Sequence, residues 1–262
     1  MEQQKIFHTI YTISEELQIP IYIVGGFVRD ELLQKEYKKD LDFVVEGSGI
    51  AFATKFAEVL GDTYATLIPF EDFDTARVAI KNDAEEVVIE IEFAGARSES
   101  YEEHSRKPKV LSSTLEHDLS RRDFTVNAMA RQILSQGKLG ELIDPFNGLQ
   151  DLKNKIIKTP LDPNITFSDD PLRMMRAARF AAQLEFEIES ETYAALVLNV
   201  DRLKIISAER ISEELFKLLR ASVPSLGLWI LFETGLFDKF LPEVRALSGV
   251  EEVYGYSHKD NL

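Results

Sequence analysis

A glycine pair followed by two closely spaced aspartates, within residues 21–45, constrains this chain more than any other feature. A short β-branched run ends at Gly25 and Gly26, and a helical pattern begins directly after it. A second apolar run then opens with Asp40 and Asp42 on either side of a leucine. This order predicts a strand, a tight turn, a helix and a second strand, and it brings a helix N-terminus close to two carboxylates.

Such an arrangement suits phosphate chemistry. Gly25 and Gly26 lack a Cβ atom, so backbone N–H groups can approach an anion closely, and a helix start adds unpaired donors. Asp40 and Asp42 are two residues apart on a predicted strand, so their side chains point to the same face. Paired carboxylates bind hard cations, usually Mg²⁺ where phosphates are present. The pattern indicates nucleotidyl or phosphoryl transfer with two magnesium ions; the structural alternative is a tight turn and a solvated strand end.

Composition narrows the class of protein. The chain has 262 residues, 45% of them hydrophobic, which is enough for one large or two modest domains. It contains no cysteine, which excludes disulfides and thiolate metal sites. The N-terminal stretch is amphipathic and does not read as a signal peptide. Since no apolar run approaches the ~20 residues of a membrane span, we expect a cytoplasmic protein without membrane partners.

The formal net charge of −15 is unusual for a protein that binds nucleic acid. Three explanations are open: the partner is small, a local basic surface binds it, or a basic segment lies outside this chain.

Apolar periodicity predicts an α+β fold whose first part is a five-stranded mixed sheet covered by helices. The expected strands are residues 21–24, 41–45, 63–68, 75–80 and 86–93, and the expected covering helices are residues 1–18, 27–34 and 49–60. Residues 96–117 are polar and aperiodic, so we expect a long loop. A helix at 119–131 and a hairpin at 131–143, turned at Gln136, follow.

From residue 167 onward the pattern is nearly all helical. The expected helices are 168–184, starting at an N-cap Ser168, and then 190–198, 207–221 and 224–234. Pro145 and Gly148 mark a joint, so the predicted domains are residues 1–145 and 146–262.

Five segments, in order, resemble the motifs of the class II tRNA nucleotidyltransferases (CCA-adding enzymes) and bacterial poly(A) polymerases. They are 21–45 (motif A), 121–130 (motif B), 144–152 (motif C), 169–184 (motif D) and 209–219 (motif E). The chain departs at Gln34 and Asp74, where the family usually or often has glycine, and at Asp169, where it has glutamate. The resemblance implies a polymerase-β-like nucleotidyltransferase head and an all-helical neck that recognises the base. A body and tail, or an HD-type domain, is expected beyond residue 262.

By this resemblance, Asp40 and Asp42 are catalytic and bind two Mg²⁺ ions, while Gly26 and Arg29 hold the triphosphate beside Gly25. A third metal carboxylate is left open between Glu90 and Glu92, which alternate on one strand face; a solvated strand edge is the alternative.

Motif B supplies two further contacts by the same resemblance. Arg122 would reach phosphate and Asp123 would accept hydrogen bonds from the ribose hydroxyls, whereas Asn127 would only brace its helix. Without the resemblance, residues 121–123 would read as a surface charge cluster.

Motif D suggests how bases are chosen. Asp170 and Arg173 are three residues apart and would share a helix face. The carboxylate would accept from the exocyclic amino group of cytosine or adenine, and the guanidinium would donate to the ring nitrogen. Uracil and guanine would instead place a carbonyl oxygen opposite the carboxylate. Two acceptors would then face each other, which would select against both bases. Arg176 and Arg179 would extend a basic stripe toward triphosphate or RNA. The alternatives are an intrahelical ion pair and a neck surface balanced by Glu185 and Glu187.

The predicted function is template-independent addition of C, C and A to tRNA 3′ ends from CTP and ATP. Residues 96–101 resemble the flexible loop that family members need for the change from C to A addition. The alternatives are an A-adding, CC-adding or poly(A)-adding enzyme, or a catalytically inactive nucleotide-binding module. The sequence leaves the oligomeric state open.

Overall fold

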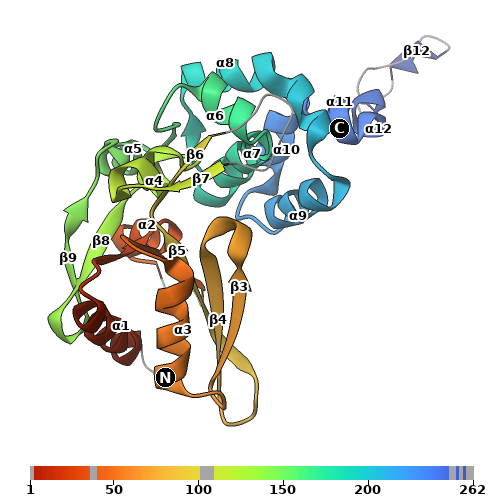
Figure 1. Cartoon of the computed structure of the whole chain (residues 1–262). Helices are drawn as coiled ribbons and strands as arrows, with labels where there is room; N and C mark the ends of the chain where they lie inside the picture. The colour runs from red at the N-terminus through yellow and green to blue at the C-terminus, as the bar shows by residue number, and fades with distance from the viewer. Residues whose placement is uncertain (1–2, 36–39, 101–108, 248–251, 254–255, 258–262) are drawn as a thin grey trace. The chain divides into compact units, whose positions relative to one another are not determined.

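The computed structural model describes residues 3–35, 40–100, 109–247, 252–253 and 256–257, and the chain forms two compact units (Figure 1). Unit 1 comprises Met1–Leu152 and unit 2 comprises Lys153–Leu262. This structural division falls after Leu152, and the functional division predicted after residue 145 stays a prediction.

Within the described residues, unit 1 is built on a seven-stranded mixed sheet of order β3-β4-β5-β2-β1-β8-β9. The strands β2 and β5 run parallel, whereas the other neighbouring pairs are antiparallel. The strands are β1 (Ile21–Val24), β2 (Asp40–Val45), β3 (Ala65–Phe70), β4 (Thr75–Lys81), β5 (Val87–Gly95), β8 (Ala130–Leu134) and β9 (Lys138–Ile143).

The prediction of five strands was wrong because the hairpin β8–β9 joins the sheet. Its turn contains Gln136 and Gly137, both at positive φ, as the glycine there suggested. Strand β8 pairs with β1, with Val24 opposite Ala130. This pairing covers a row of β1 backbone groups that would otherwise be an open sheet edge.

Aromatic side chains build the core on one face of the sheet, under α1 (Gln3–Leu17) and α3 (Gly49–Leu60) (Figure 1). Phe52 and Phe56 of α3 pack against Phe93 of β5, with ring centroids 5.3 and 5.2 Å apart. Phe7 of α1 meets Phe43 of β2 edge-on at 5.9 Å. Because side chains alternate along a strand, this core directs the neighbours of Phe43 to the opposite face.

On the opposite face, the short helix α4 (Leu115–Ser120) covers the part of the sheet that contains the C-terminal end of β2. Val44 of β2 packs there with Leu115 and Leu119 of α4 and with Val24 of β1. Residues of β2 on this face therefore change from exposed to buried along the strand, and the exposed part is the part that carries Asp40 and Asp42.

The helix predicted at 119–131 was wrong. The structure has the end of α4, a 3-10 turn η2 (Thr125–Asn127) and then β8. Asp123 Oδ1 accepts a hydrogen bond from Phe124 N, and Thr125 Oγ1 donates to Asp151 Oδ2, at 2.8 and 2.7 Å. Such side-chain bonds compete with a continuous helix.

The long loop predicted at 96–117 was wrong in part. Strands β6 (Arg97–Ser100) and β7 (Lys109–Ser112) pair as an antiparallel ladder, and α4 begins at Leu115. Residues 101–108 lie outside the described part of the chain, so the loop's proposed role in changing from C to A addition stays a prediction.

Unit 2 is helical, as predicted, with two-residue ladders added among the described residues: β10 (Ile156–Ile157) with β11 (Glu187–Ile188), and β12 (Glu252–Val253) with β13 (Tyr256–Ser257). Helix α7 is its most buried element, and a Cβ atom at Gly227 would lie 2.8 Å from Ala178 O, so α10 approaches α7 closely. The helices that follow residue 160 are α6 (Pro163–Asp169), α7 (Leu172–Leu184), α8 (Ser190–Asn199), α9 (Ala208–Leu219), α10 (Pro224–Glu233), α11 (Phe237–Phe240) and α12 (Pro242–Ala246). Two further helices, α2 (Gly26–Leu32) and α5 (Gly148–Asn154), come earlier in the sequence. The 3-10 turns are η1 (Glu71–Phe73), η3 (Ser135–Gly137) and η4 (Val200–Ile205).

The single helix predicted at 168–184 is divided into α6 and α7 at Asp170. Asp170 is extended, with φ −135° and ψ 97°, because the residue before a proline disfavours helical geometry. Ser168 lies inside α6, whose N-cap is Asp162, and Pro171 is the N-cap of α7. The division places Asp170 outside α7.

Asp74 generates a stability prediction, because it caps α3 from another segment. Its carboxylate accepts from Ser48 Oγ (2.7 Å), Gly49 N (3.2 Å) and Ile50 N (3.3 Å). We expect Asp74→Ala to lower the free energy of unfolding by about 1–2 kcal/mol, the usual loss for a helix cap. Asp74→Asn keeps a side-chain oxygen and tolerates the left-handed φ of 42°, so it should lose less. Urea denaturation checks this, and an Asp74→Ala variant as stable as the parent contradicts it.

Candidate active site

The turn after β1 has a backbone that requires glycine. Gly25 has φ 69° and ψ −132°, a conformation that L side chains rarely adopt. A Cβ atom at this position would lie 3.0 Å from Arg122 Nη1 and 3.7 Å from Asp42 Oδ2. Gly25 N donates to Met129 O at 3.3 Å. The turn is therefore the point where the segments carrying Asp42 and Arg122 meet.

Gly26 is different from its neighbour. It is the first residue of α2, and a Cβ atom there would have Arg29 Nη2, at 3.5 Å, as its nearest neighbour among the described residues. That distance is ordinary van der Waals contact. Packing within the protein therefore does not explain why this position lacks a side chain, whereas close approach of a ligand to the backbone would explain it.

Asp40 and Asp42 share one exposed face of β2, as predicted. Leu41 between them is buried, and the burial alternates along the strand from Asp40 to Phe43. Both carboxylates are at the surface, and Asp42 lies beside the Gly25 turn. The chemistry of this donor pair fits a hard divalent cation such as Mg²⁺.

Glu90 and Glu92 extend the acidic face onto β5. In the parallel register Asp40 is opposite Glu90 and Asp42 is opposite Glu92. Arg77 of β4 pairs with both glutamates, at 3.7 Å to Glu90 Oε2 and 3.6 Å to Glu92 Oε2.

The identity of a third metal carboxylate stays open between Glu90 and Glu92. In the part of the chain that is described, no group of three or more acid, histidine or cysteine side chains is arranged to hold a metal ion. The fit to a cation therefore rests on Asp40 and Asp42 alone.

Asp118 is a fully buried carboxylate that binds two arginines. Its Oδ2 accepts from Arg122 Nε (3.3 Å) and Nη2 (3.1 Å), and its Oδ1 accepts from Arg121 Nε (3.1 Å) and from Arg121 Nη2. Burial by itself raises the pKa of the Asp118 carboxyl, but the charges of Arg122 and Arg121 outweigh burial and hold this pKa below its ordinary value. Asp118 is therefore ionised and holds Arg122 beside the turn.

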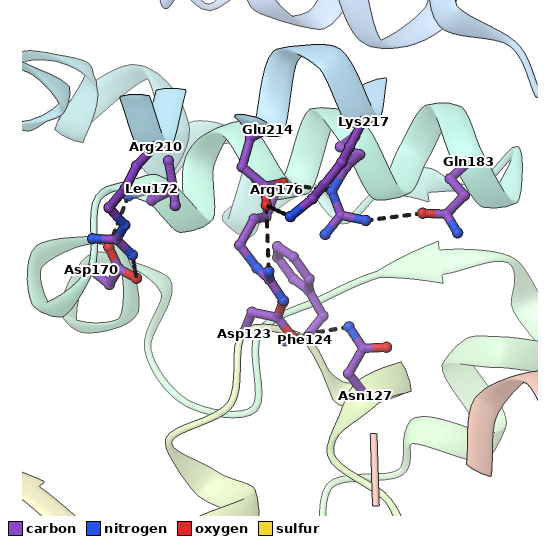
Figure 2. A network of polar contacts seen from close by, with 11 residues as sticks. Asp123, Phe124, Asn127, Asp170, Leu172, Arg176, Gln183, Arg210, Glu214 and Lys217 are labelled. Carbon is purple, nitrogen blue, oxygen red and sulfur yellow. Dashed lines mark hydrogen bonds and ion pairs between the residues drawn. The ribbon is translucent and has the colours of Figure 1, made fainter. Parts of the chain in front are cut away.

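Arg29 and Asp123, two predicted nucleotide contacts, belong to one hydrogen-bonded chain. Arg29 is 2% exposed, and it donates from Nε to Asp30 Oδ1 (2.8 Å) and from Nη1 to Asn127 Oδ1 (2.6 Å). Asn127 Nδ2 in turn donates to Asp123 Oδ1 at 3.0 Å (Figure 2). Asn127 thus connects α2 to the motif B segment, and it braces a 3-10 turn, not the helix that was predicted.

In unit 2, Asp170 is held at the start of α7. Its Oδ1 accepts from Leu172 N (3.2 Å) and its Oδ2 accepts from Arg210 Nη2 (3.2 Å) (Figure 2). Arg173 Nη1 donates to Thr166 O at 3.3 Å. The prediction that Asp170 and Arg173 share a helix face was wrong, because Asp170 precedes α7 in extended geometry.

Arg176 and Arg179 face a buried acid on α9. Glu214 is 3% exposed, and its carboxylate lies 3.7 Å from Arg176 Nη1 (Figure 2). Arg179 Nε lies 2.6 Å from the same carboxylate. Lys217 Nζ lies 3.4 Å from the same carboxylate. The predicted basic stripe is therefore balanced by Glu214, and the side chain of Arg179 is buried while that of Arg176 is partly exposed.

The mixed sheet with paired acids beside a glycine turn defines a polymerase-β-like nucleotidyltransferase head, which is followed here by a helical region. Residues 21–158 match the family model described as the poly A polymerase head domain. Residues 185–247 match the model described as the probable RNA and SrmB-binding site of polymerase A. The chain belongs to the class II tRNA nucleotidyltransferase and poly(A) polymerase family.

Relatives agree with this placement. The chain is 42% identical over 201 residues to an A-adding tRNA nucleotidyltransferase of Aquifex aeolicus (strain VF5). The aligned region covers 76% of this chain and 23% of that relative. It is 38% identical over 246 residues to a CCA-adding enzyme of Geobacillus sp. (strain WCH70), covering 92% of the chain and 55% of the enzyme.

Solved structures agree as well. An apo form of a CCA-adding enzyme matches with a TM-score of 0.76 and 32% identity, covering 92% of this chain and 54% of that one. A tRNA nucleotidyltransferase complexed with a primer tRNA and an incoming ATP analogue matches with a TM-score of 0.72 and 35% identity, over 88% and 62% of the two chains. The chain spans about half the length of the CCA-adding relatives that it matches.

Sequence reasoning missed Asp118, Arg210 and Glu214. Asp118 had a local signal, since it precedes Arg121 and Arg122 by three and four residues, the spacing of side-chain pairs on a helix. Arg210 and Glu214 had no local signal, because their partners Asp170 and Arg179 lie 40 and 35 residues earlier in the sequence and only the folded chain brings them together.

The two glycines give a matched prediction. We expect Gly25→Ala to lower the free energy of unfolding by about 1–3 kcal/mol, because it forces a side chain into positive φ and against Arg122. Gly26→Ala should stay within about 1 kcal/mol of the parent, on the stabilising side, since alanine favours the helix. Urea denaturation of both variants measures the difference. Equal losses of stability would contradict the geometry of the turn.

Proposed function

We propose that this chain carries the catalytic and base-recognising parts of a tRNA nucleotidyltransferase that adds C, C and A to tRNA 3′ ends from CTP and ATP. The proposal assigns catalysis to a head of residues 1–145 and base recognition to a neck of residues 146–262. The observation that carries it is the exposure of Asp40 and Asp42 on one face of β2, beside the Gly25 turn.

The proposed cofactor is a pair of Mg²⁺ ions held by Asp40 and Asp42. When bound, such ions lower the pKa of an attacking hydroxyl and neutralise charge on the leaving pyrophosphate. The protein's own part is to place charges and donors around the nucleotide before it reacts. Arg122 and the start of α2 with Gly26 would receive the phosphates, and Asp123 would accept from the ribose hydroxyls.

Arg29 fits this scheme less directly than predicted from sequence. Its guanidinium is buried and bound to Asp30 and Asn127. We propose that it supports the site by connecting α2 to Asn127, and through Asn127 to Asp123.

Asp170 and Arg173 are proposed to read the base in the neck. The carboxylate of Asp170 is oriented by Leu172 N and Arg210, yet its side chain stays partly exposed. It could therefore accept from the exocyclic amino group of cytosine or adenine while Arg173 donates to the ring nitrogen. Uracil or guanine would place an acceptor against the carboxylate and leave a desolvated charge.

Arg176 and Arg179 would then have different parts. Arg176 is the accessible member and is the candidate contact to triphosphate or RNA. Arg179 is buried against Glu214, and its guanidinium lies 3.9 Å from the centroid of the Phe180 ring. We propose that Arg179 keeps α7 and α9 together.

The proposed partners are the tRNA 3′ end, CTP and ATP. Solved relatives include one complexed with a primer tRNA and an ATP analogue, and another with CTP. Among the described helices, none is both long and apolar enough to cross a membrane.

A second candidate function is the addition of A alone, since a relative with 42% identity is named an A-adding tRNA nucleotidyltransferase.

Metal-dependent incorporation tests the function. We expect the chain to add C to a tRNA that lacks its CCA end, and A to one that ends in CC, with both reactions requiring Mg²⁺. Asp42→Ala should reduce incorporation by roughly 10²–10³-fold or more, because it removes a ligand of the cation that would neutralise transition-state charge. Its free energy of unfolding should change by no more than about 0.5 kcal/mol, because Asp42 is exposed.

Asp83→Ala is the matched control, since Asp83 is an exposed aspartate of the same unit and lies between β4 and β5. Incorporation of A without C would favour the A-adding candidate. Full turnover by the Asp42→Ala variant would remove Asp42 from the proposed chemistry.

Base choice tests the neck. We expect Asp170→Ala to lower the preference for CTP over UTP by roughly tenfold, which is about 1.4 kcal/mol of lost discrimination. The Mg²⁺ requirement should not change, because the metal carboxylates are in the head. Competition between labelled CTP and UTP measures the preference, with Asp201→Ala as the exposed control in unit 2. A variant that rejects UTP as strongly as the parent would refute the role of Asp170.

A further inference from the structure

We infer that Asp118 is a positioning residue that holds Arg122 toward the phosphates of the bound nucleotide; the inference rests on the proposed function. The Asp118 side chain binds Arg121 and Arg122, and we assign it no direct contact with the nucleotide. It acts through the guanidinium that it binds.

The buried carboxylate of Asp118 depends on its two arginines to compensate for the loss of water. Removing a carboxylate from water is unfavourable by several kcal/mol unless partners compensate for it. Asp118 is 0% exposed; its Oδ1 accepts from Arg121 and its Oδ2 accepts from Arg122. Because Arg122 binds Oδ2 through two of its nitrogens, Nε and Nη2, the plane of its guanidinium is fixed as well as its position.

The direction of Arg122 follows from which nitrogens Asp118 engages. Asp118 Oδ2 accepts from Nε and Nη2, and the remaining nitrogen, Nη1, lies 3.0 Å from the Cβ position of Gly25. That position is 3.7 Å from Asp42 Oδ2. The guanidinium is thus held with Nη1 toward the turn where the proposed nucleotide places its phosphates.

Holding the side chain in advance matters because a free arginine loses much rotamer entropy when it binds a ligand. With Asp118 in place, that ordering has already occurred in the folded protein. Replacing Asp118 should therefore weaken the binding of phosphates, and the loss should grow with the number of phosphates that reach Arg122.

The test is the binding of CTP and CMP, with Mg²⁺, to the 262-residue chain by isothermal titration calorimetry. Asp118→Asn keeps the shape of the side chain and removes its charge. We expect about a tenfold loss of CTP affinity and little loss for CMP, so that the ratio of the two affinities falls. In an Arg122→Ala background, Asp118→Asn should cause no further loss.

Asp144→Asn is the matched control. Asp144 accepts from Gly148 N (2.7 Å) and Leu149 N (2.9 Å), so its change can lower stability without moving an arginine. Its CTP to CMP ratio should equal that of the parent. A general loss of stability would not lower that ratio selectively, whereas a displaced Arg122 would.

The inference is overturned if Asp118→Asn binds CTP and CMP in the parent's ratio, or if its effect adds fully to that of Arg122→Ala. If Asp118→Asn does not fold, Asp118→Glu keeps the charge and lengthens the side chain by a methylene, and the same fall in the ratio is required of it. A parent chain that binds neither nucleotide refutes the proposed function itself, and that result is distinct from an unchanged ratio.

Discussion

The alternation of side chains along β2 is the constraint on which the site depends. Phe43 packs against Phe7 and Phe93 in the aromatic core, so its neighbours Asp42 and Val44 must point to the other face. A shift of one residue in the register would bury Asp40 and Asp42 among aromatic rings. Burial of an unpaired carboxylate is so unfavourable that this alternative is excluded. The hydrophobic core therefore determines where the acids stand.

In each of the two units, arginines are bound by acids, and these pairs account for part of the acidic side chains behind the net charge of −15. Arg122 is bound by Asp118, Arg29 by Asp30, Arg179 by Glu214, and Arg210 by Asp170. In each pair the carboxylate orients a guanidinium that would otherwise sample many rotamers. Part of the acidic composition thus serves to position basic groups, so an acidic chain remains compatible with polyanionic substrates. Asp40 and Asp42 of β2 form the exposed face that suits a cation.

Local pattern was enough to predict the strand that carries Asp40 and Asp42, because alternation and burial are both encoded within a few residues. It was also enough for the turn at Gly25, because the glycine pair directly follows the short apolar strand. The division at Asp170 was also readable, since Pro171 follows it, but a proline also suits the first turn of a helix, and this agreed with a single helix starting at Ser168. The helix expected at 119–131 failed because Asp123 and Thr125 make side-chain bonds that no helical periodicity reports.

Contacts between distant segments were beyond such reasoning. The pairing of Val24 with Ala130 adds two strands to the sheet, and nothing near either residue indicates the partner. Likewise Glu214 and Arg179 are brought together only by the packing of α9 on α7. The resemblance to known motifs identified the right segments, whereas their mutual support became visible only in the folded chain.

A crystal structure of the chain with CTP and Mn²⁺ tests the central claim most directly, because anomalous scattering locates the metal independently of the model. Our account predicts a metal peak between the carboxylates of Asp40 and Asp42, with the triphosphate against Gly26 and Arg122. A metal bound away from this pair, or a triphosphate that lies away from the glycine turn, would contradict it.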